Sequence, residues 1–198
     1  FLANPNNPTG TYIADQEVQE FLNEFGNDPE RLIIFDEAYT EYVRAKDYKT
    51  ALEYLPKNSS VVVIRTLSKA YGMAGLRVGI LLAPPTVIDF YNRVRNPFNV
   101  NDLAQAATIA ALQDDEFIQA SVKNNSQGLD YFYKELARLG LPYIESQGNF
   151  VLFDTCRDVA LVNEELLRRG VILRPVLNYG LKTQLRMSVG LEIRHLRF

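Results

Sequence analysis

The chain has 198 residues, a net charge of -3 at pH 7, and 47% hydrophobic and 23% charged residues, values typical of a folded globular protein with a sizeable core. This charge balance gives no electrostatic reason to expect a nucleic acid or an anionic membrane as a partner. Cys156 is the only cysteine and His195 the only histidine, which argues against an internal disulfide, a metal site and a Ser-His-Asp arrangement. Acid–base chemistry would then have to come from Lys, Asp, Glu or Tyr.

The first part of the chain alternates a predicted helix with short apolar runs. The Asn, Pro and Gly cluster at 4–10 predicts a turn. A helix is expected over 15–25, with Asp15 as its N-cap and Gly26 just past its end. Three apolar runs predict buried strands of an α/β sheet, namely LIIF at 32–35, VVVI at 61–64 and VGILL at 78–82.

The pattern changes at Asp102, where a helix-rich stretch begins that runs to residue 139 and is ended by Gly140. The later predicted elements are a strand at 149–153, a helix at 159–169 stopped by Gly170, and strand-like pieces at 171–174 and 185–189. We therefore predict an α/β fold with two parts. Residues 1–115 would belong to a domain with a mostly parallel sheet, and residues 116–198 would form a smaller α+β domain.

Several side chains in the first part could carry chemistry. Asp36 follows a predicted buried strand, at the end where open α/β sheets place their ligand-binding residues. Thr66, Ser68 and Lys69 follow the next strand, in a loop of the kind that often holds phosphate. Arg77 provides a second positive charge eight residues after Lys69.

Each of these residues also has a purely structural explanation. Asp36 could be a cap or a surface residue, Lys69 a solvated side chain, and Arg77 the partner of a carboxylate. Tyr39 could be ordinary packing. Taken singly they do not decide a function, and the interpretation depends on their order along the chain.

Six motifs occur in a defined order over nearly the whole sequence. This ordered set closely resembles the fold-type I pyridoxal-phosphate-dependent aminotransferases, and especially the histidinol-phosphate aminotransferase group. The motifs are NPNNPTG at 4–10, DEAYTEY at 36–42, RTLSKAYGMAGLRVG at 65–79, RNPFNVN at 95–101, GNFVLFD at 148–154 and LRMSVG at 185–190.

The resemblance implies roles around a bound pyridoxal 5′-phosphate, with Lys69, Asp36 and Tyr39 as catalytic residues. Lys69 would carry the cofactor and then move the proton of the substrate Cα. Asp36 would pair with the ring nitrogen and keep it protonated. Asn7 and Tyr39 would hydrogen-bond the ring's phenolate oxygen. No metal is implied.

The same resemblance assigns the cofactor phosphate to Thr66, Ser68 and Arg77. Their two hydroxyls would act as donors and the guanidinium as a charge-assisted fork.

Three further residues would bind substrate. Arg186 matches the arginine that clamps the substrate α-carboxylate, a planar group suited to a guanidinium. Arg174 matches a position that contributes to binding the substrate's own phosphate, with a surface arginine as the competing explanation. Asn149 lies where the small domain faces the active site, with a structural turn as the alternative.

The expected activity is transamination between histidinol phosphate and 2-oxoglutarate in histidine biosynthesis, by a cytoplasmic homodimer. The alternatives are an aromatic amino acid aminotransferase, a related decarboxylase of a phosphorylated amino acid, and an inactive fragment that only binds or dimerises. A nucleotide-binding loop at 66–69 is disfavoured, because the glycine pattern of a P-loop is lacking.

The sequence departs from the family at both ends. The segment that supplies a phosphate-binding turn, a ring-stacking aromatic residue and a tyrosine donated across the dimer is missing, and LEIRHLRF at 191–198 replaces an acidic helical segment. No initiator Met is present. We therefore expect the chain to be a fragment.

Overall fold

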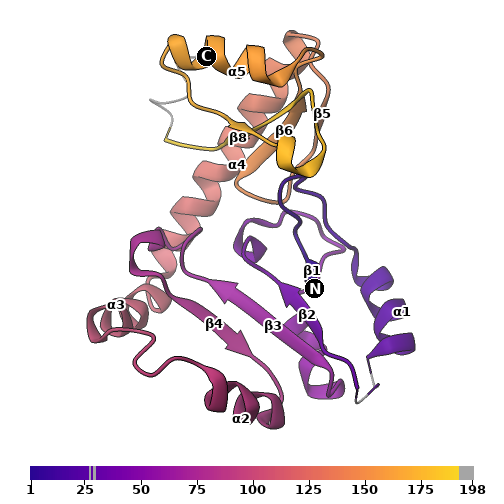
Figure 1. The fold of residues 1–198 in the computed structure, drawn as a ribbon, viewed down its shortest axis with the longest axis vertical. Helices are drawn as coiled ribbons and strands as arrows, with labels where there is room; N and C mark the ends of the chain where they lie inside the picture. The colour runs from indigo at the N-terminus through magenta and orange to yellow at the C-terminus, as the bar shows by residue number, and fades with distance from the viewer. Residues whose placement is uncertain (27, 29, 192–198) are drawn as a thin grey trace.

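Two sheets and one long helix organise the molecule. The computed structural model describes residues 1–26, 28 and 30–191, so His195 lies outside the described residues. A first sheet and a second sheet lie one beyond the other along the long axis, and helix α4 (Asp115–Arg138) begins near the upper end of the first sheet and runs past the second (Figure 1). Within the described part of the chain, no helix is both long enough and apolar enough to cross a membrane.

The first sheet is mostly parallel, as predicted. Its order is β1-β2-β3-β4, with β4 antiparallel to β3 and the other pairs parallel. Because β2 and β3 are paired in register up to Asp36↔Ile64, their carboxyl ends lie at the same edge of the sheet. The strands are β1 (Leu2–Ala3), β2 (Ile33–Asp36), β3 (Val61–Thr66) and β4 (Gly79–Leu82).

The core of the first sheet explains why these apolar runs become strands. Val61 and Val63 of β3 pack with Phe35 of β2 and with Val18 and Leu22 of helix α1 (Asp15–Phe25), all of them buried. Burying a side chain of this size stabilises the fold by about 1.5–3 kcal/mol.

Two predicted details at this sheet are wrong. The N-cap of α1 is Ala14, whose N–H donates to the Glu17 carboxylate (3.1 Å). Asp15 is instead the first helical residue, and its carboxylate pairs with Lys49 (3.0 Å). Leu32 precedes β2 and is exposed.

The connection between the sheets is helical, as predicted from residue 102 onward. It consists of α3 (Asp102–Leu112) and α4, which are separated by two residues. The second of them, Asp114, caps α4 by accepting a hydrogen bond from the Phe117 N–H (3.0 Å). A further helix, α2 (Pro85–Val94), was not predicted.

The second sheet is antiparallel, with order β5-β6-β8-β7. The strand predicted at 171–174 is wrong for its first three residues. Gly170 takes a positive φ of 77°, and the Val171 N–H then donates to Leu166 O (2.9 Å), which completes the end of the preceding helix. The elements are β5 (Tyr143–Ile144), β6 (Phe150–Asp154), α5 (Val159–Arg168), β7 (Arg174–Pro175) and β8 (Gln184–Ser188).

Alternation along β6 separates two environments. Val151 and Phe153 pack with Leu129 of α4 and Leu185 of β8 in one buried cluster. Phe150 belongs to a different cluster, with residues that follow the first sheet. Since successive strand residues point to opposite faces, one face of the second sheet forms its own core and the other face meets the first part of the chain.

Candidate active site

Two of the predicted residues end neighbouring strands at the edge of the first sheet. Asp36 is the last residue of β2 and Thr66 the last of β3. The Asp36 side chain is exposed, and its Oδ1 accepts a hydrogen bond from the Ala38 N–H (3.1 Å). Adjacent carboxyl ends of parallel strands are where open α/β sheets bind ligands.

The loop after β3 is shaped by its own hydroxyl and amide groups. Thr66 Oγ1 accepts from the Ser68 N–H (3.1 Å) and donates weakly to Val78 O (3.4 Å). The Gly72 N–H donates to Lys69 O (3.0 Å), with Gly72 at a φ of 69°. This turn presents Ser68 and Lys69, both half-buried, beyond the end of β3.

Arg77 is placed apart from the other predicted residues by its contacts. It has a positive φ of 57°, and its Nη1 donates to Ala74 O (2.9 Å) in the preceding turn. The side chain lines a cavity of about 530 Å³ between β4 and α2, together with Arg95 and Asn99.

Tyr39 and Lys69 lie side by side. The Lys69 Nζ is 5.3 Å from the centroid of the Tyr39 ring, within reach of a cation–π interaction. Tyr39 is buried and immediately precedes the short helix η1 (Thr40–Tyr42). Burial raises the pKa of Glu41 and of Tyr42 in η1, the Tyr42 hydroxyl being also hydrogen-bonded to Ser121.

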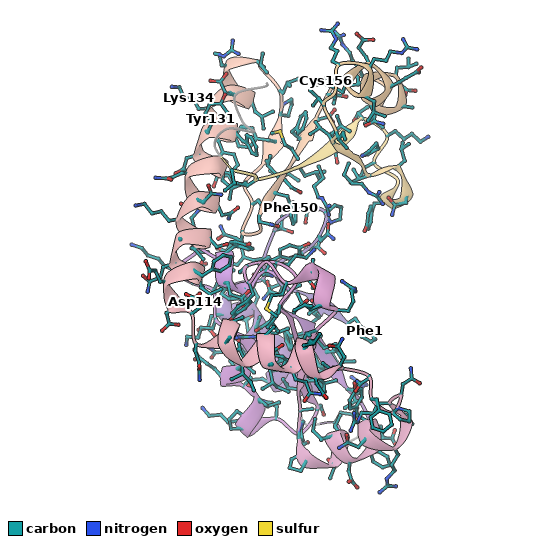
Figure 2. All side chains as sticks on the ribbon, turned by 90° about the vertical axis from the view of Figure 1, so that its left-hand side faces the viewer. Phe1, Asp114, Tyr131, Lys134, Phe150 and Cys156 are labelled. Carbon is teal, nitrogen blue, oxygen red and sulfur yellow. The ribbon has the colours of Figure 1, made fainter. Side chains whose placement is uncertain are left out.

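Phe150 joins this pair to the second sheet, and the sequence interpretation did not single it out. Its ring meets the Tyr39 ring edge-on, with centroids 5.2 Å apart and planes at 80°. The Phe150 ring has a second partner, Arg186, whose guanidinium carbon lies 5.1 Å from the ring centroid. Figure 2 shows Phe150 at the junction of the two parts. The available signal was its place next to Asn149 in the GNF motif.

Arg186 brings the N-terminal segment into the site. Its Nη1 donates to Asn7 Oδ1 (2.5 Å). Its Nε is buried and has no hydrogen-bond partner among the described residues. Such a buried donor is costly unless a further group accepts from it.

The other two predicted substrate residues flank Arg186. Arg174 of β7 lies directly opposite Arg186 of β8 in the strand pairing. Asn149 is half-buried just before β6, and its carbonyl accepts from the Val189 N–H (2.9 Å). The strand pairing thus brings two arginines together that are twelve residues apart in the sequence.

An ion pair between the buried Glu37 and the half-buried Arg65 was also missed. Glu37 is 1% exposed and its Oε2 accepts from Arg65 Nε (3.1 Å) and Nη2 (2.9 Å). Each residue is next to a predicted site residue, since Glu37 follows Asp36 and Arg65 precedes Thr66. The signal available in the sequence was a charge at matching positions beyond two parallel apolar runs.

Other features of the described residues do not compete with this site. They contain no group of three or more His, Cys, Asp or Glu placed to hold a metal ion. An apolar cavity of about 480 Å³ lies between α4, α5 and the second sheet, lined by Phe132, Phe153 and Leu166 among others. None of the predicted site residues lines it.

Comparison with known proteins places this arrangement in a family. The family model for aminotransferase class I and II matches residues 1–197. The chain is 62% identical over 190 residues to a histidinol-phosphate aminotransferase of Bdellovibrio bacteriovorus, covering 96% of this chain and 51% of the relative. The chain spans about half the length of the curated relatives it matches.

Solved structures agree with the fold. The histidinol-phosphate aminotransferase of Clostridium acetobutylicum superposes with a TM-score of 0.92 at 25% identity, over 100% of this chain and 60% of that one. The Sinorhizobium meliloti enzyme, solved in complex with pyridoxal-5′-phosphate, gives 0.88 at 29% identity, over 99% and 54%. The chain therefore belongs to the aminotransferase class I and II family.

Proposed function

We propose that the protein carrying this chain is a pyridoxal-phosphate-dependent aminotransferase that transfers an amino group between histidinol phosphate and 2-oxoglutarate, in histidine biosynthesis. The observation that carries the proposal is the meeting of Lys69, Tyr39 and Arg186 through Phe150, at the edge where Asp36 and Thr66 end their strands. The choice of histidinol phosphate as the substrate rests on the relatives named above, which are histidinol-phosphate aminotransferases.

The residues present fit pyridoxal phosphate. Asp36 offers a carboxylate at a strand end, whose Oδ1 is hydrogen-bonded only through a backbone N–H among the described contacts. Asn7 has its Oδ1 occupied by Arg186, so that its Nδ2 is the group that would donate to a phenolate oxygen. Thr66 and Ser68 bring hydroxyls to the end of β3. The Arg77 guanidinium, which donates to Ala74 O instead, would have to turn toward these hydroxyls to share a phosphate with them.

Each residue then has a task. Pyridoxal phosphate, when bound, supplies an electron-accepting ring. Asp36 would hold a proton on the ring nitrogen by its negative charge. The Lys69 amine would take the proton from the substrate Cα and return it at the cofactor carbon C4′. Tyr39 would orient the Lys69 amine, since its ring lies against the Lys69 Nζ.

The paired arginines suit an anionic substrate. Like charges directly opposite each other on neighbouring strands are unfavourable, and Arg174 and Arg186 occupy such positions. A bound anion would remove that repulsion and would also accept from the buried Arg186 Nε. Arg186 would bind the α-carboxylate of 2-oxoglutarate or of the glutamate formed from it, and Arg174 the phosphate of histidinol phosphate. Asn149 would contribute at the edge of the same site.

We also propose the larger organisation implied by the resemblance. Residues 1–115 would be part of the cofactor-binding domain and residues 116–198 the small domain, with the boundary at the start of α4. The protein would be a cytoplasmic homodimer.

Attachment of the cofactor is the decisive test. The protein is mixed with pyridoxal phosphate and reduced with borohydride, and the labelled lysine is mapped by mass spectrometry. We expect label on Lys69 that is abolished in Lys69→Ala and retained in Lys134→Ala, a control at an exposed lysine on α4 (Figure 2). Equal label on both lysines, or none, would refute the proposed function.

Product analysis separates the alternatives. Turnover of histidinol phosphate no faster than turnover of phenylalanine would favour an aromatic amino acid aminotransferase. Release of carbon dioxide from a phosphorylated amino acid would favour the decarboxylase. Attachment of cofactor without any turnover would favour the inactive fragment.

A further inference from the structure

We propose that the ion pair between the buried Glu37 and the half-buried Arg65 is a positioning device, which sets how Asp36 at the end of β2 stands relative to the Thr66–Lys69 loop after β3. The inference rests on the function proposed above, because it concerns the residues assigned there to the cofactor. Glu37 and Arg65 are positioning residues, with no contact to the cofactor assigned to them.

The pair continues the alignment of the two strands beyond their ends. The Glu37 N–H donates to Ile64 O (2.9 Å), one residue past the Asp36↔Ile64 pair that closes the β2–β3 register. Glu37 and Arg65 therefore extend from matching positions on parallel strands. Asp36 is exposed whereas Glu37 is buried, as expected where successive side chains point to opposite sides.

Donors from two segments, Arg65 of β3 and the Thr50–Ala51 turn, fix the Glu37 carboxylate. Besides the two bonds from Arg65, Oε2 accepts from Thr50 Oγ1 (2.7 Å) and Oε1 accepts from the Ala51 N–H (2.5 Å). Arg65 Nη2 also donates to Thr50 Oγ1 (2.7 Å). Charge-assisted bonds of this kind are short and directional. A carboxylate held by donors on two segments leaves the backbone on either side of it little freedom.

The location of the pair favours positioning over stability. Desolvation offsets much of the attraction in a buried ion pair, and apolar residues of similar size are often as stable. Two to four residues earlier in β3, the side chains are the buried valines 61–63, with no charged group among them. The ion pair occurs one residue past the last β2–β3 pair, Asp36↔Ile64, where the bond from the Glu37 N–H to Ile64 O is followed by side-chain bonds between the two segments.

Three variants of the protein at its natural length separate the two roles. Glu37→Gln keeps an oxygen for the Ala51 N–H but removes the charge, and Arg65→Lys keeps the charge but removes the fork. Glu37→Gln/Arg65→Met removes both charges, so that no charge is left unpaired. Val61→Ala is the matched control, because it opens a cavity at the far end of β3 and leaves the pair intact.

The main readout is the dissociation constant for pyridoxal phosphate, measured by absorbance titration beside thermal unfolding. We expect all three variants to bind the cofactor about tenfold more weakly, including the double variant, whose unfolding temperature should stay near that of the wild type. Val61→Ala should unfold at a lower temperature with unchanged affinity. If affinity follows unfolding temperature across all four variants, the pair is structural only and the inference is overturned.

Amide hydrogen exchange without cofactor provides an independent readout. The Glu37 and Ser68 N–H groups report on the two sides of the pair, through their bonds to Ile64 O and Thr66 Oγ1. We expect both to exchange about tenfold faster in Glu37→Gln and at wild-type rates in Val61→Ala. Unchanged exchange in Glu37→Gln overturns the inference. A wild-type protein that binds no pyridoxal phosphate overturns the proposed function instead, and exchange alone then decides on positioning.

Discussion

Phe150 is the residue whose replacement tests how the two parts of the site are joined, and Phe150→Leu is the cleanest change. Leucine keeps an apolar side chain of similar size but removes the ring that contacts Tyr39 and Arg186. The edge-on aromatic contact is worth about 1 kcal/mol, the cation–π contact about 1 kcal/mol, and the change of shape below about 1.5 kcal/mol. We expect the free energy of unfolding to fall by about 2–3 kcal/mol.

Phe153→Leu is the matched control on the same strand. Phe153 is also buried but packs on the opposite face of β6, against Leu129 and Leu185. The change of shape alone should lower its free energy of unfolding by about 1 kcal/mol. Urea unfolding of both variants measures the difference, provided that the dependence on denaturant stays equal between them.

The same pair of variants has different effects on activity if the proposed function holds. Without the ring beneath it, the Arg186 guanidinium should bind the 2-oxoglutarate carboxylate about 1 kcal/mol more weakly. This corresponds to a roughly fivefold higher KM for 2-oxoglutarate with kcat little changed. Phe153→Leu should leave KM unchanged. Equal losses of stability in the two variants, together with equal KM values, would refute the reasoning.

Two further changes test the scaffold around the site. In Gly10→Ala, at a φ of 75°, the new Cβ would clash with Ser146 Oγ, so urea unfolding should show a free energy of unfolding lower by about 3 kcal/mol. Gly180→Ala is the control, because φ is 78° there but the new Cβ would meet no neighbouring atom within 4 Å; it should lose about 1 kcal/mol. Equal losses in the two variants would contradict the clash. The hydrogen bond from the Tyr54 hydroxyl is the main cause that lowers the pKa of Asp15 from 3.8 to about 2, so its contribution to stability is complete above about pH 4 and is lost as the pH falls toward 2. Asp15→Asn should flatten stability against pH in that window, and an unchanged slope would show that this carboxylate is not responsible.

Local sequence patterns were sufficient for the elements that hold the site. The runs at 61–64 and 78–82 became β3 and β4 because their β-branched and aliphatic side chains suit a buried sheet. Gly170 marked the end of α5 because it reaches a positive φ that other residues avoid. The misplaced N-cap of α1 has a different cause, because a tertiary contact replaced a local one there. Asp15 is a suitable N-cap by residue type, yet its carboxylate is engaged by Lys49 and Tyr54.

The missed site features share a different cause. The Glu37–Arg65 pair depends on which residues of β2 and β3 stand side by side, and register is set by the packed sheet rather than by either strand. Phe150 reads as a core residue from its own neighbours in sequence. Its contacts with Tyr39 and Arg186 exist only because the two sheets meet at this face. Residue type predicted the charged groups, whereas their mutual positions required the fold.

The N-terminal segment shows how far this dependence extends. Asn7 and Arg186 are hydrogen-bonded although 179 positions separate them. The same segment is attached to the second part of the chain by the Gln147 N–H, which donates to Gly10 O (2.8 Å), and the absence of a side chain at Gly10 lets Ser146 approach. Because Asn7 lies three residues before this attachment, a change in the 146–147 loop should alter the Asn7–Arg186 contact without touching either residue. The geometry offered to a carboxylate at Arg186 is thus set partly by backbone contacts outside the site.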